Sequence, residues 1–202
     1  MIKVEDYNIA YVRNPKCAST SIMRWLKSLP GKIDNLRSDK HDQHGNIPDT
    51  LKYNNLKRED LGFVFTTVRN PWIREYSNYH MLSSRPYANP KQVEMINQSK
   101  DFNHFIELVD GNSFKYSYDS KSPEPQSYWT RQCDLVIKIE ELDKEFSKIQ
   151  NMAKVTRELS FHNVKANYNP RNYKEIYNQK TIDIVYRANK GDIEKYNYEF
   201  PS

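Results

Sequence analysis

The sequence is short of cysteine and has no long apolar run, and each shortage excludes a class of protein. Its 202 residues include two cysteines, Cys17 and Cys133, which can neither build a framework of disulfide bridges nor provide metal-ligand spacing. We therefore expect free thiols in a reducing compartment. No stretch approaches the length of a membrane span, and charges come too early in the first residues for a signal peptide. These absences predict a cytoplasmic protein with no membrane partner.

Glycine is also scarce, and its distribution excludes a common nucleotide-binding loop. No glycine lies between Met1 and Pro30, whereas a P-loop needs the pattern G-x-x-x-x-G-K-[ST]. A cysteine-phosphatase loop of the form C-x-x-x-x-x-R is excluded as well, because Arg24 follows Cys17 one residue too late. Cys17 is therefore expected to be a small packing residue and not a nucleophile. The missing glycine loops and the absence of an acidic pair for Mg²⁺ disfavour a kinase.

Composition and charge describe a globular chain with an anionic partner. Aromatic residues make up 13% of the sequence, including 15 tyrosines, which argues against disorder. The length fits one α/β domain, residues 1–202. A net charge of +5 suits a phosphorylated cofactor, an acidic glycan or a nucleic acid, or simply a solvated basic surface. Because the basic residues are spread evenly and no recognition motif is present, no nucleic-acid partner is expected.

Hydrophobic patterning predicts strands alternating with helices. Apolar or β-branched runs predict strands at residues 7–12, 63–68 and 135–139. Helical spacing predicts helices at residues 19–29, 71–82, 101–109, 142–153 and 181–196. Residues 32–60, 83–100, 110–125 and 160–173 are expected to be polar or irregular connections. This order predicts an α/β fold with a parallel sheet flanked by helices, whose ligands bind at the carboxyl ends of the strands.

The first loop of chemical interest follows the first predicted strand. Residues 15–21 (PKCASTS) lead into a helix, and a helix N-terminus offers unpaired N–H groups and a positive dipole end to an anion. Lys16 adds a charge, and the hydroxyls that follow add donors. Ser19 or Thr20 is expected to cap the helix. The alternative is an ordinary capped helix with a solvated lysine.

The second loop follows the second predicted strand. Residues 66–79 (TTVRNPWIREYSNY) place Arg69 at the strand end, where its fork can grip a phosphate. Ser77 lies eight residues later, about two helical turns along the next helix, so its hydroxyl could meet the same phosphate. The alternative is an arginine that pairs with a carboxylate to fasten the helix. We favour that alternative for Arg74 and the phosphate for Arg69.

Together the two loops resemble the cofactor signature of the sulfotransferases, in particular the carbohydrate sulfotransferases of the type 2 family. That signature reads PK-x-x-[ST]-[ST]-[ST] and V-R-[ND]-P-x-x-R-x-x-S-x-Y. The resemblance extends to residues 39–41, 135–142 and 192–200, and so covers most of the chain in the right order. It implies a P-loop-NTPase-like sulfotransferase fold and an enzyme that uses 3′-phosphoadenosine 5′-phosphosulfate (PAPS), releases 3′-phosphoadenosine 5′-phosphate (PAP), and sulfates a carbohydrate or other hydroxyl.

The resemblance also implies residue roles. Lys16 would neutralise the oxygen of the leaving nucleotide, and His41 would be the general base, with His44 and Asp39 as the open alternatives. The implied cofactor-binding residues are Lys16, Cys17, Ala18, Ser19, Thr20, Ser21, Arg69, Ser77, Arg171 and Lys174. No metal is implied. For His41, Arg171 and Lys174 an ordinary solvated loop position remains open.

The sequence departs from the family pattern at two places, and two other functions remain open. Glu75-Tyr76 replaces the usual apolar pair, so this helix is expected to pack differently. Cys17-Ala18 stands where a glycine often occurs, which would alter how closely the backbone approaches the sulfate. A catalytically inactive relative that binds nucleotide or glycan, and a basic nucleic-acid-binding protein, remain alternatives. Animal glycan sulfotransferases usually carry a Golgi anchor, so we expect a microbial or viral source, or a shortened chain.

Overall fold

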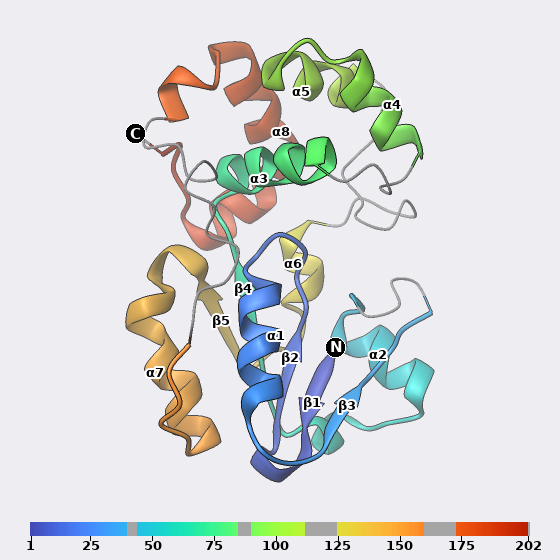
Figure 1. Ribbon diagram of the computed structural model, residues 1–202, viewed down its shortest axis with the longest axis vertical. Helices are drawn as coiled ribbons and strands as arrows, with labels where there is room; N and C mark the ends of the chain where they lie inside the picture. The colour runs from blue at the N-terminus through green and yellow to red at the C-terminus, as the bar shows by residue number, and fades with distance from the viewer. Residues whose placement is uncertain (40–43, 85–89, 112–124, 160–172, 202) are drawn as a thin grey trace. The chain divides into compact units, whose positions relative to one another are not determined.

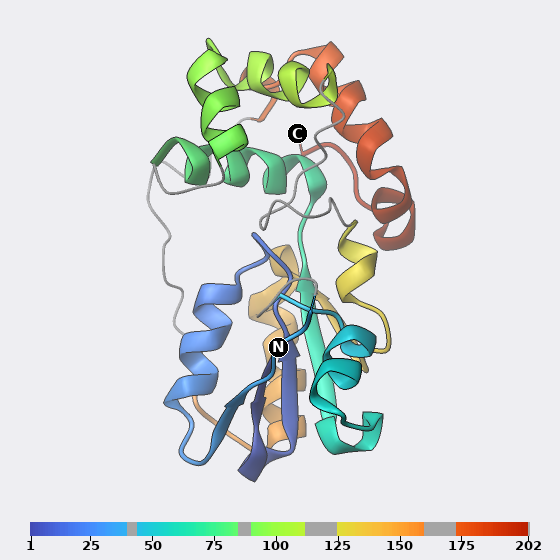
Figure 2. The same cartoon turned by 90° about the vertical axis from the view of Figure 1, so that its right-hand side faces the viewer.

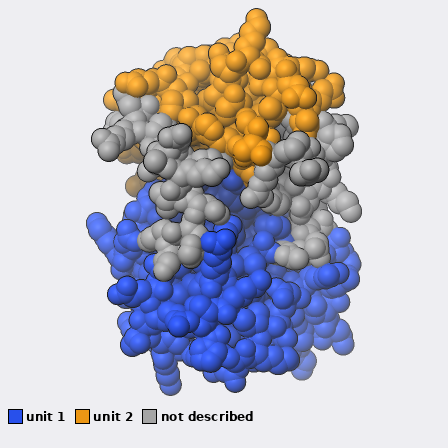
Figure 3. All heavy atoms as spheres, viewed as in Figure 1, with its two compact units in different colours: residues 1–69, 126–163 blue, residues 70–125, 164–202 orange. Residues whose placement is uncertain are grey.

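A computed structural model describes residues 1–39, 44–84, 90–111, 125–159 and 173–201. The chain forms two compact units, each assembled from two separate stretches (Figure 3). Unit 1 comprises residues 1–69 and 126–163, and unit 2 comprises residues 70–125 and 164–202. The chain therefore first passes from unit 1 into unit 2 between Arg69 and Asn70, inside the second loop. One domain over residues 1–202 stays a prediction.

Unit 1 is built around a five-stranded sheet with the order β3-β1-β2-β4-β5. Its strands are β1 (Ile2–Val4), β2 (Ile9–Val12), β3 (Ile33–Asn35), β4 (Phe63–Val68) and β5 (Leu135–Lys138). Its helices are η1 (Glu5–Tyr7), α1 (Ser19–Ser28), α2 (Ile47–Asn54), η2 (Arg58–Leu61), α6 (Gln126–Trp129), η3 (Ile139–Glu141) and α7 (Leu142–Ala153). Strands β2, β4 and β5 are parallel, while β1 is antiparallel to both β2 and β3.

The α/β class and the flanked sheet are confirmed, and the sheet proves to be mixed. The three predicted strands are β2, β4 and β5, and they are the parallel ones. The antiparallel strands β1 and β3 were not predicted. Each has only three residues, too few for a period-two pattern to stand out. The stretch 32–60, expected to be irregular, contains β3 and α2.

Helices cover both faces of the sheet in unit 1, as Figure 2 shows for α1 on one side and α2 and α6 on the other. Along β2, Ile9 and Tyr11 pack with α1 and α7, whereas Ala10 and Val12 pack with α2 and α6. Neighbouring side chains of a strand point to opposite faces. The strand is therefore apolar throughout because both of its faces are covered, as parallel strands require.

The register places two loops at one edge of the sheet. Val12 at the end of β2 is paired with Thr66 near the end of β4. Since the two strands are parallel, the loop after β2 and the residues after β4 leave the sheet from the same edge (Figure 1). This is the edge at which open α/β sheets bind ligands.

The described part of unit 2 is helical. It contains α3 (Pro71–Ser84), α4 (Pro90–Gln98), α5 (Phe102–Gly111), η5 (Tyr173–Glu175) and α8 (Gln179–Tyr196). Its core is rich in aromatic side chains that meet edge to face, including Trp72 with Phe200 and Phe102 with Tyr177. The helices predicted at 71–82, 101–109 and 181–196 correspond to α3, α5 and α8. Helix α4 was expected to be an irregular surface excursion, yet its Met95 is buried in this core.

Candidate functional site

The loop between β2 and α1 is held in a strained conformation. Lys16 has φ 64° and Ala18 has φ 60°, both in the left-handed region. For residues other than glycine this region costs about 1–2 kcal/mol each. Non-glycine residues in sparsely populated backbone regions cluster at ligand-binding and active sites. The loop therefore keeps its shape against an intrinsic preference of its own residues.

Hydrogen bonds to β4 fasten this loop. The Asn14 side chain donates to the Thr67 carbonyl at 2.9 Å, and the Ser19 hydroxyl donates to the Asn14 carbonyl at 2.8 Å. The Thr67 hydroxyl donates to the Cys17 carbonyl. Asn14, Cys17 and Thr67 are fully buried. The position of the loop is therefore fixed by buried polar contacts and not by glycine.

The N-terminus of α1 has no side-chain cap, which corrects the expectation that Ser19 or Thr20 would provide one. The capping position is Ala18, which has no side-chain acceptor to offer. Ser19 instead turns its hydroxyl back to Asn14, and Thr20 is exposed. The first turn contains no acidic residue, and its Ser21 is buried. A helix end of this kind favours an anion through its N–H groups and its dipole.

Arg69 follows β4 at the same edge and reaches this loop. One guanidinium nitrogen, Nη1, donates to the Lys16 carbonyl at 3.3 Å. Its Nε–H is buried and has no hydrogen-bond partner among the described residues. Lys16 and Arg69 are both half-buried. Two predicted cofactor residues from different loops are thus in direct contact within unit 1.

Gln126 makes a contact with both loops that the sequence did not reveal. Its amide Nε2 donates to the Arg69 carbonyl, and its Oε1 accepts from the Arg69 N–H, each at 2.8 Å. The same Oε1 accepts from the Cys17 thiol at 3.2 Å. Gln126 lies 57 residues after Arg69, and a single glutamine carries no periodicity or motif that marks such a contact.

The rest of the second loop lies in unit 2, where Asn70 caps helix α3. Its Oδ1 accepts from the Trp72 N–H at 3.2 Å, and its Nδ2 donates to the Glu199 carbonyl at 2.7 Å. Ser77 is buried on α3, and Lys174 is exposed in η5. Phosphate binding by Ser77 and Lys174 stays a prediction. Arg171 lies outside the described residues.

The three candidates for a general base are placed differently. His41, the first choice, lies outside the described residues, and Asp39 is exposed. His44 is half-buried, and its Nδ1 lies 3.0 Å from the Arg13 carbonyl, at the start of the first loop. A carbonyl only accepts, so Nδ1 carries the proton and Nε2 is the basic nitrogen of the neutral ring.

The described residues contain neither a candidate metal cluster nor a helix that could span a membrane. Residues 1–39, 44–84, 90–111, 125–159 and 173–201 contain no cluster of three or more His, Cys, Asp or Glu residues that could hold a metal ion. In the same ranges, no helix has both the length and the apolar character needed to cross a membrane.

Comparison with known proteins identifies one family. The model of the sulfotransferase family matches residues 1–199, nearly the whole chain and both loops. The search of curated proteins and the search of solved structures gave no match. Because the match spans the sheet, the strained loop of Lys16 and strand β4 with the Arg69 that follows it, the chain belongs to the sulfotransferase family.

Proposed function

We propose that the protein transfers a sulfuryl group from PAPS to a hydroxyl group, and that the acceptor is a carbohydrate. One observation carries the proposal: the loop of Lys16, the uncapped end of α1 and the Arg69 guanidinium lie together at one sheet edge. All three favour an anion. PAPS carries two anionic groups, and the family match supports sulfuryl transfer as the reaction.

The 5′-phosphosulfate is assigned to the end of α1. The N–H groups of residues 18–21 and the Ser21 hydroxyl supply donors, and the helix dipole adds favourable charge. Lys16 contributes a compact ammonium on a flexible stem, suited to follow charge as it develops. Lys16 lies two residues before Ala18, the N-cap residue of α1, and its backbone is left-handed.

The 3′-phosphate is assigned to Arg69, with Ser77 as its partner. A guanidinium binds phosphate through two parallel hydrogen bonds, and Arg69 has a buried Nε–H to contribute. The assignment of Ser77 rests on the family signature and on its spacing of eight residues from Arg69. Arg171 and Lys174 are proposed to add further contacts to the nucleotide on the same basis.

The proposed reaction uses these positions. The acceptor oxygen attacks sulfur in line, its new S–O bond forms, and the bond from sulfur to the 5′-phosphate oxygen breaks, releasing PAP. Catalysis of such transfers is positioning and charge stabilisation. Lys16 would neutralise the leaving oxygen. The proton of the acceptor hydroxyl passes to a base, for which we propose His41, with His44 and Asp39 as alternatives.

The nucleotide site is tested by calorimetric titration with PAP. We expect micromolar binding to the wild-type protein and loss of binding in Arg69→Ala. Arg24→Ala is the matched control, because Arg24 is an exposed arginine on α1 and its loss removes the same charge. A folded wild-type protein that does not bind PAP would overturn the proposal. Equal losses in the two variants would show only a general effect of charge.

The base is tested by the pH dependence of turnover in His41→Ala, His44→Ala and Asp39→Ala. Loss of the base should remove the acidic limb from the pH profile of kcat. It should also lower kcat by typically about 10²–10⁴-fold. A variant that keeps wild-type turnover removes that residue from the mechanism. The acceptor is tested by screening glycans against tyrosine peptides, lipids and small hydroxyl compounds, with transfer of labelled sulfate as the readout.

A further inference from the structure

The side-chain amide of Gln126 lies between the two nucleotide loops. Gln126 opens the short helix α6 and is completely buried. A buried amide must have its donors and its acceptor satisfied, because an unpaired polar group inside a protein is costly. The partners of this amide determine the role of Gln126.

The first partner is the main chain of Arg69. Nε2 donates to the Arg69 carbonyl and Oε1 accepts from the Arg69 N–H, both at 2.8 Å. The side chain therefore pairs with Arg69 at two points, as a neighbouring strand would. Arg69 has just left β4, so the amide continues the pairing for one residue beyond the sheet. This fixes the backbone from which the guanidinium extends.

The second partner is the loop of Lys16. Oε1 also accepts from the Cys17 thiol at 3.2 Å, and the Arg69 guanidinium donates to the Lys16 carbonyl at 3.3 Å. Because Lys16 and Cys17 are consecutive, these contacts close a ring through Gln126, Arg69 and the loop. The ring lies within unit 1. A displacement of either loop would break at least one of these bonds.

We propose that Gln126 is a positioning residue that holds Arg69 and the Lys16 loop in the register that a 3′,5′-bisphosphate requires. This rests on the proposed function, since it takes Arg69 and the Lys16 loop as the phosphate-binding elements. Gln126 itself touches no substrate in this assignment. A nucleotide with both phosphates needs both loops at a fixed spacing, whereas one with a single phosphate does not.

The contact with the main chain of Arg69 suits the side-chain amide of glutamine. The pairing with Arg69 needs one donor and one acceptor at the same end of the side chain. Leucine has neither. Ionised glutamate has two acceptors, so it faces the Arg69 carbonyl with a negative charge and loses that bond. Protonated glutamate again has one donor and one acceptor. In the contacts with the two loops, the amide meets the main chain of Arg69 and one titratable side chain, the Cys17 thiol.

The experiment compares PAP with adenosine 5′-monophosphate by calorimetry on the wild type, Gln126→Leu and Gln126→Glu. At pH 8 we expect both variants to lose PAP affinity by about tenfold to hundredfold, by analogy with the removal of an outer hydrogen-bond partner that orients a metal ligand. Affinity for the monophosphate should change much less. In Gln126→Glu the ratio to wild-type PAP affinity should recover as the pH falls towards 5, and in Gln126→Leu it should not.

Controls separate the outcomes. Gln132→Glu makes the same substitution at an exposed position and should bind PAP as the wild type does. Wild-type binding of PAP that Arg69→Ala abolishes and Gln126→Leu leaves intact would overturn this inference and keep the proposed function. Equal loss of both nucleotides would also overturn it. If Gln126→Leu does not fold, Gln126→Glu across pH carries the same test. No PAP binding by the wild type would overturn both.

Discussion

The hydroxyl oxygens of Tyr11 and Thr67 lie 3.0 Å apart, across the neighbouring parallel strands β2 and β4. The single hydroxyl proton of Thr67 is already donated to the Cys17 carbonyl, so Tyr11 is the donor of this pair. Burial raises the pKa of Tyr11 far above its usual value, which keeps the phenol protonated. A chain of buried hydrogen bonds thus runs from β2 through β4 to the strained loop.

These buried hydrogen bonds predict that substitutions of Tyr11 and Thr67 have non-additive effects on the free energy of unfolding. Thr67→Val removes two buried hydrogen bonds, one with the Tyr11 hydroxyl and one with the Cys17 carbonyl, and should lower the free energy of unfolding by about 2–4 kcal/mol. Tyr11→Phe should cost about 1 kcal/mol. The double variant should be less destabilised than the sum, because removing both partners leaves fewer unpaired groups. Urea unfolding of the wild type, the two single variants and the double variant measures the coupling between the two hydroxyls. Simple additivity would show that the two hydroxyls do not act together.

Lys16 predicts a separation of binding from chemistry. Since its proposed role is to stabilise charge that develops on the leaving oxygen, Lys16→Ala should lower kcat by about 10²–10³-fold. PAP affinity should fall by much less. Steady-state kinetics beside calorimetry measure both. Lys27→Ala, at an exposed lysine in the last turn of α1, is the matched control and should leave kcat unchanged. A Lys16 variant that loses affinity but keeps kcat would assign the residue to binding alone.

Glu75 predicts a pH-dependent stability. It is 2% exposed on α3, and its Oε2 has no hydrogen-bond partner among the described residues. Burial raises its pKa from an ordinary value of 4.5 to about 7, and the charge of Arg74 offsets only part of this effect. Between these values the folded protein binds more protons than the unfolded chain. Stability should therefore fall as the pH rises from about 4.5 to 7, by about 3 kcal/mol from this group.

Glu75→Gln tests this sign. The amide cannot ionise, so the variant should lack this part of the slope and should be more stable than the wild type at pH 8. Thermal unfolding of both proteins between pH 4 and pH 8 gives the difference. Glu141→Gln, at an exposed glutamate, should run parallel to the wild type. Parallel curves for Glu75→Gln as well would mean that the carboxyl is solvated.

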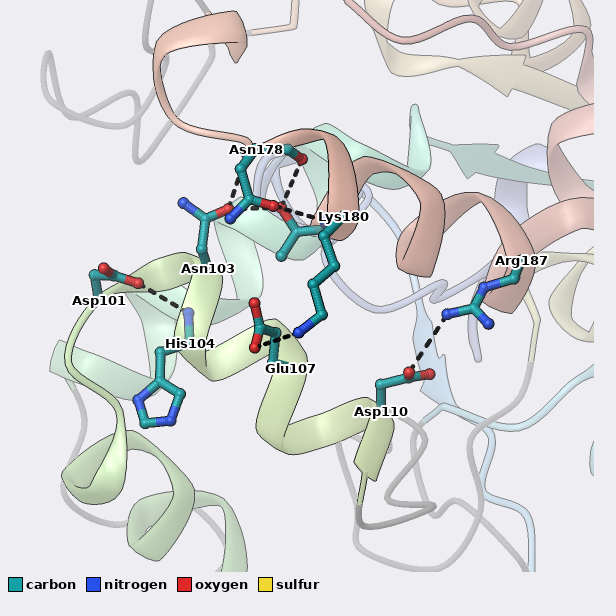
Figure 4. Close-up of polar contacts among 9 residues, drawn as sticks. Asp101, Asn103, His104, Glu107, Asp110, Asn178, Lys180 and Arg187 are labelled. Carbon is teal, nitrogen blue, oxygen red and sulfur yellow. Dashed lines mark hydrogen bonds and ion pairs between the residues drawn. The ribbon is translucent and has the colours of Figure 1, made fainter.

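We expect the half-buried polar contacts of Asn103 to stabilise the fold more than a surface ion pair between α5 and α8 does (Figure 4). Its Nδ2 donates to the Ile176 carbonyl at 2.7 Å, and its Oδ1 accepts from the Asn178 N–H at 3.1 Å and from the buried Thr181 hydroxyl at 2.6 Å. Asn103→Ala removes all three bonds and should cost about 2–3 kcal/mol of unfolding free energy.

Lys180→Ala removes the surface ion pair and is compared with Asn103→Ala. Lys180 pairs with Glu107 at 2.8 Å between the same helices, but the lysine side chain is 67% exposed. Such pairs contribute about 0–1 kcal/mol because water screens them. Urea unfolding of the two variants shows which of them loses more free energy of unfolding. A larger loss in Lys180→Ala would reverse it.

The sequence by itself determined the α/β class, the parallel strands and the two loops of the site. All three features come from local chemistry. A short continuous run of apolar and β-branched residues, such as that of β4, signals a strand covered on both faces, and the loop after each parallel strand must leave from one edge. Lys16 and Arg69 could therefore be predicted to share an edge although 53 residues separate them. Strands β1 and β3 and helices α2, α4 and α6 could not, because their patterns are short or mostly polar.

Only the tertiary structure decided how those loops are held. The left-handed backbone of Lys16 and Ala18, the buried contacts of Asn14 and Thr67, and the amide of Gln126 between Cys17 and Arg69 have no sequence signal. Each depends on groups far apart along the chain, which packing brings to hydrogen-bond distance. Local patterns report the environment that a segment requires, whereas buried polar pairing is decided when distant segments meet.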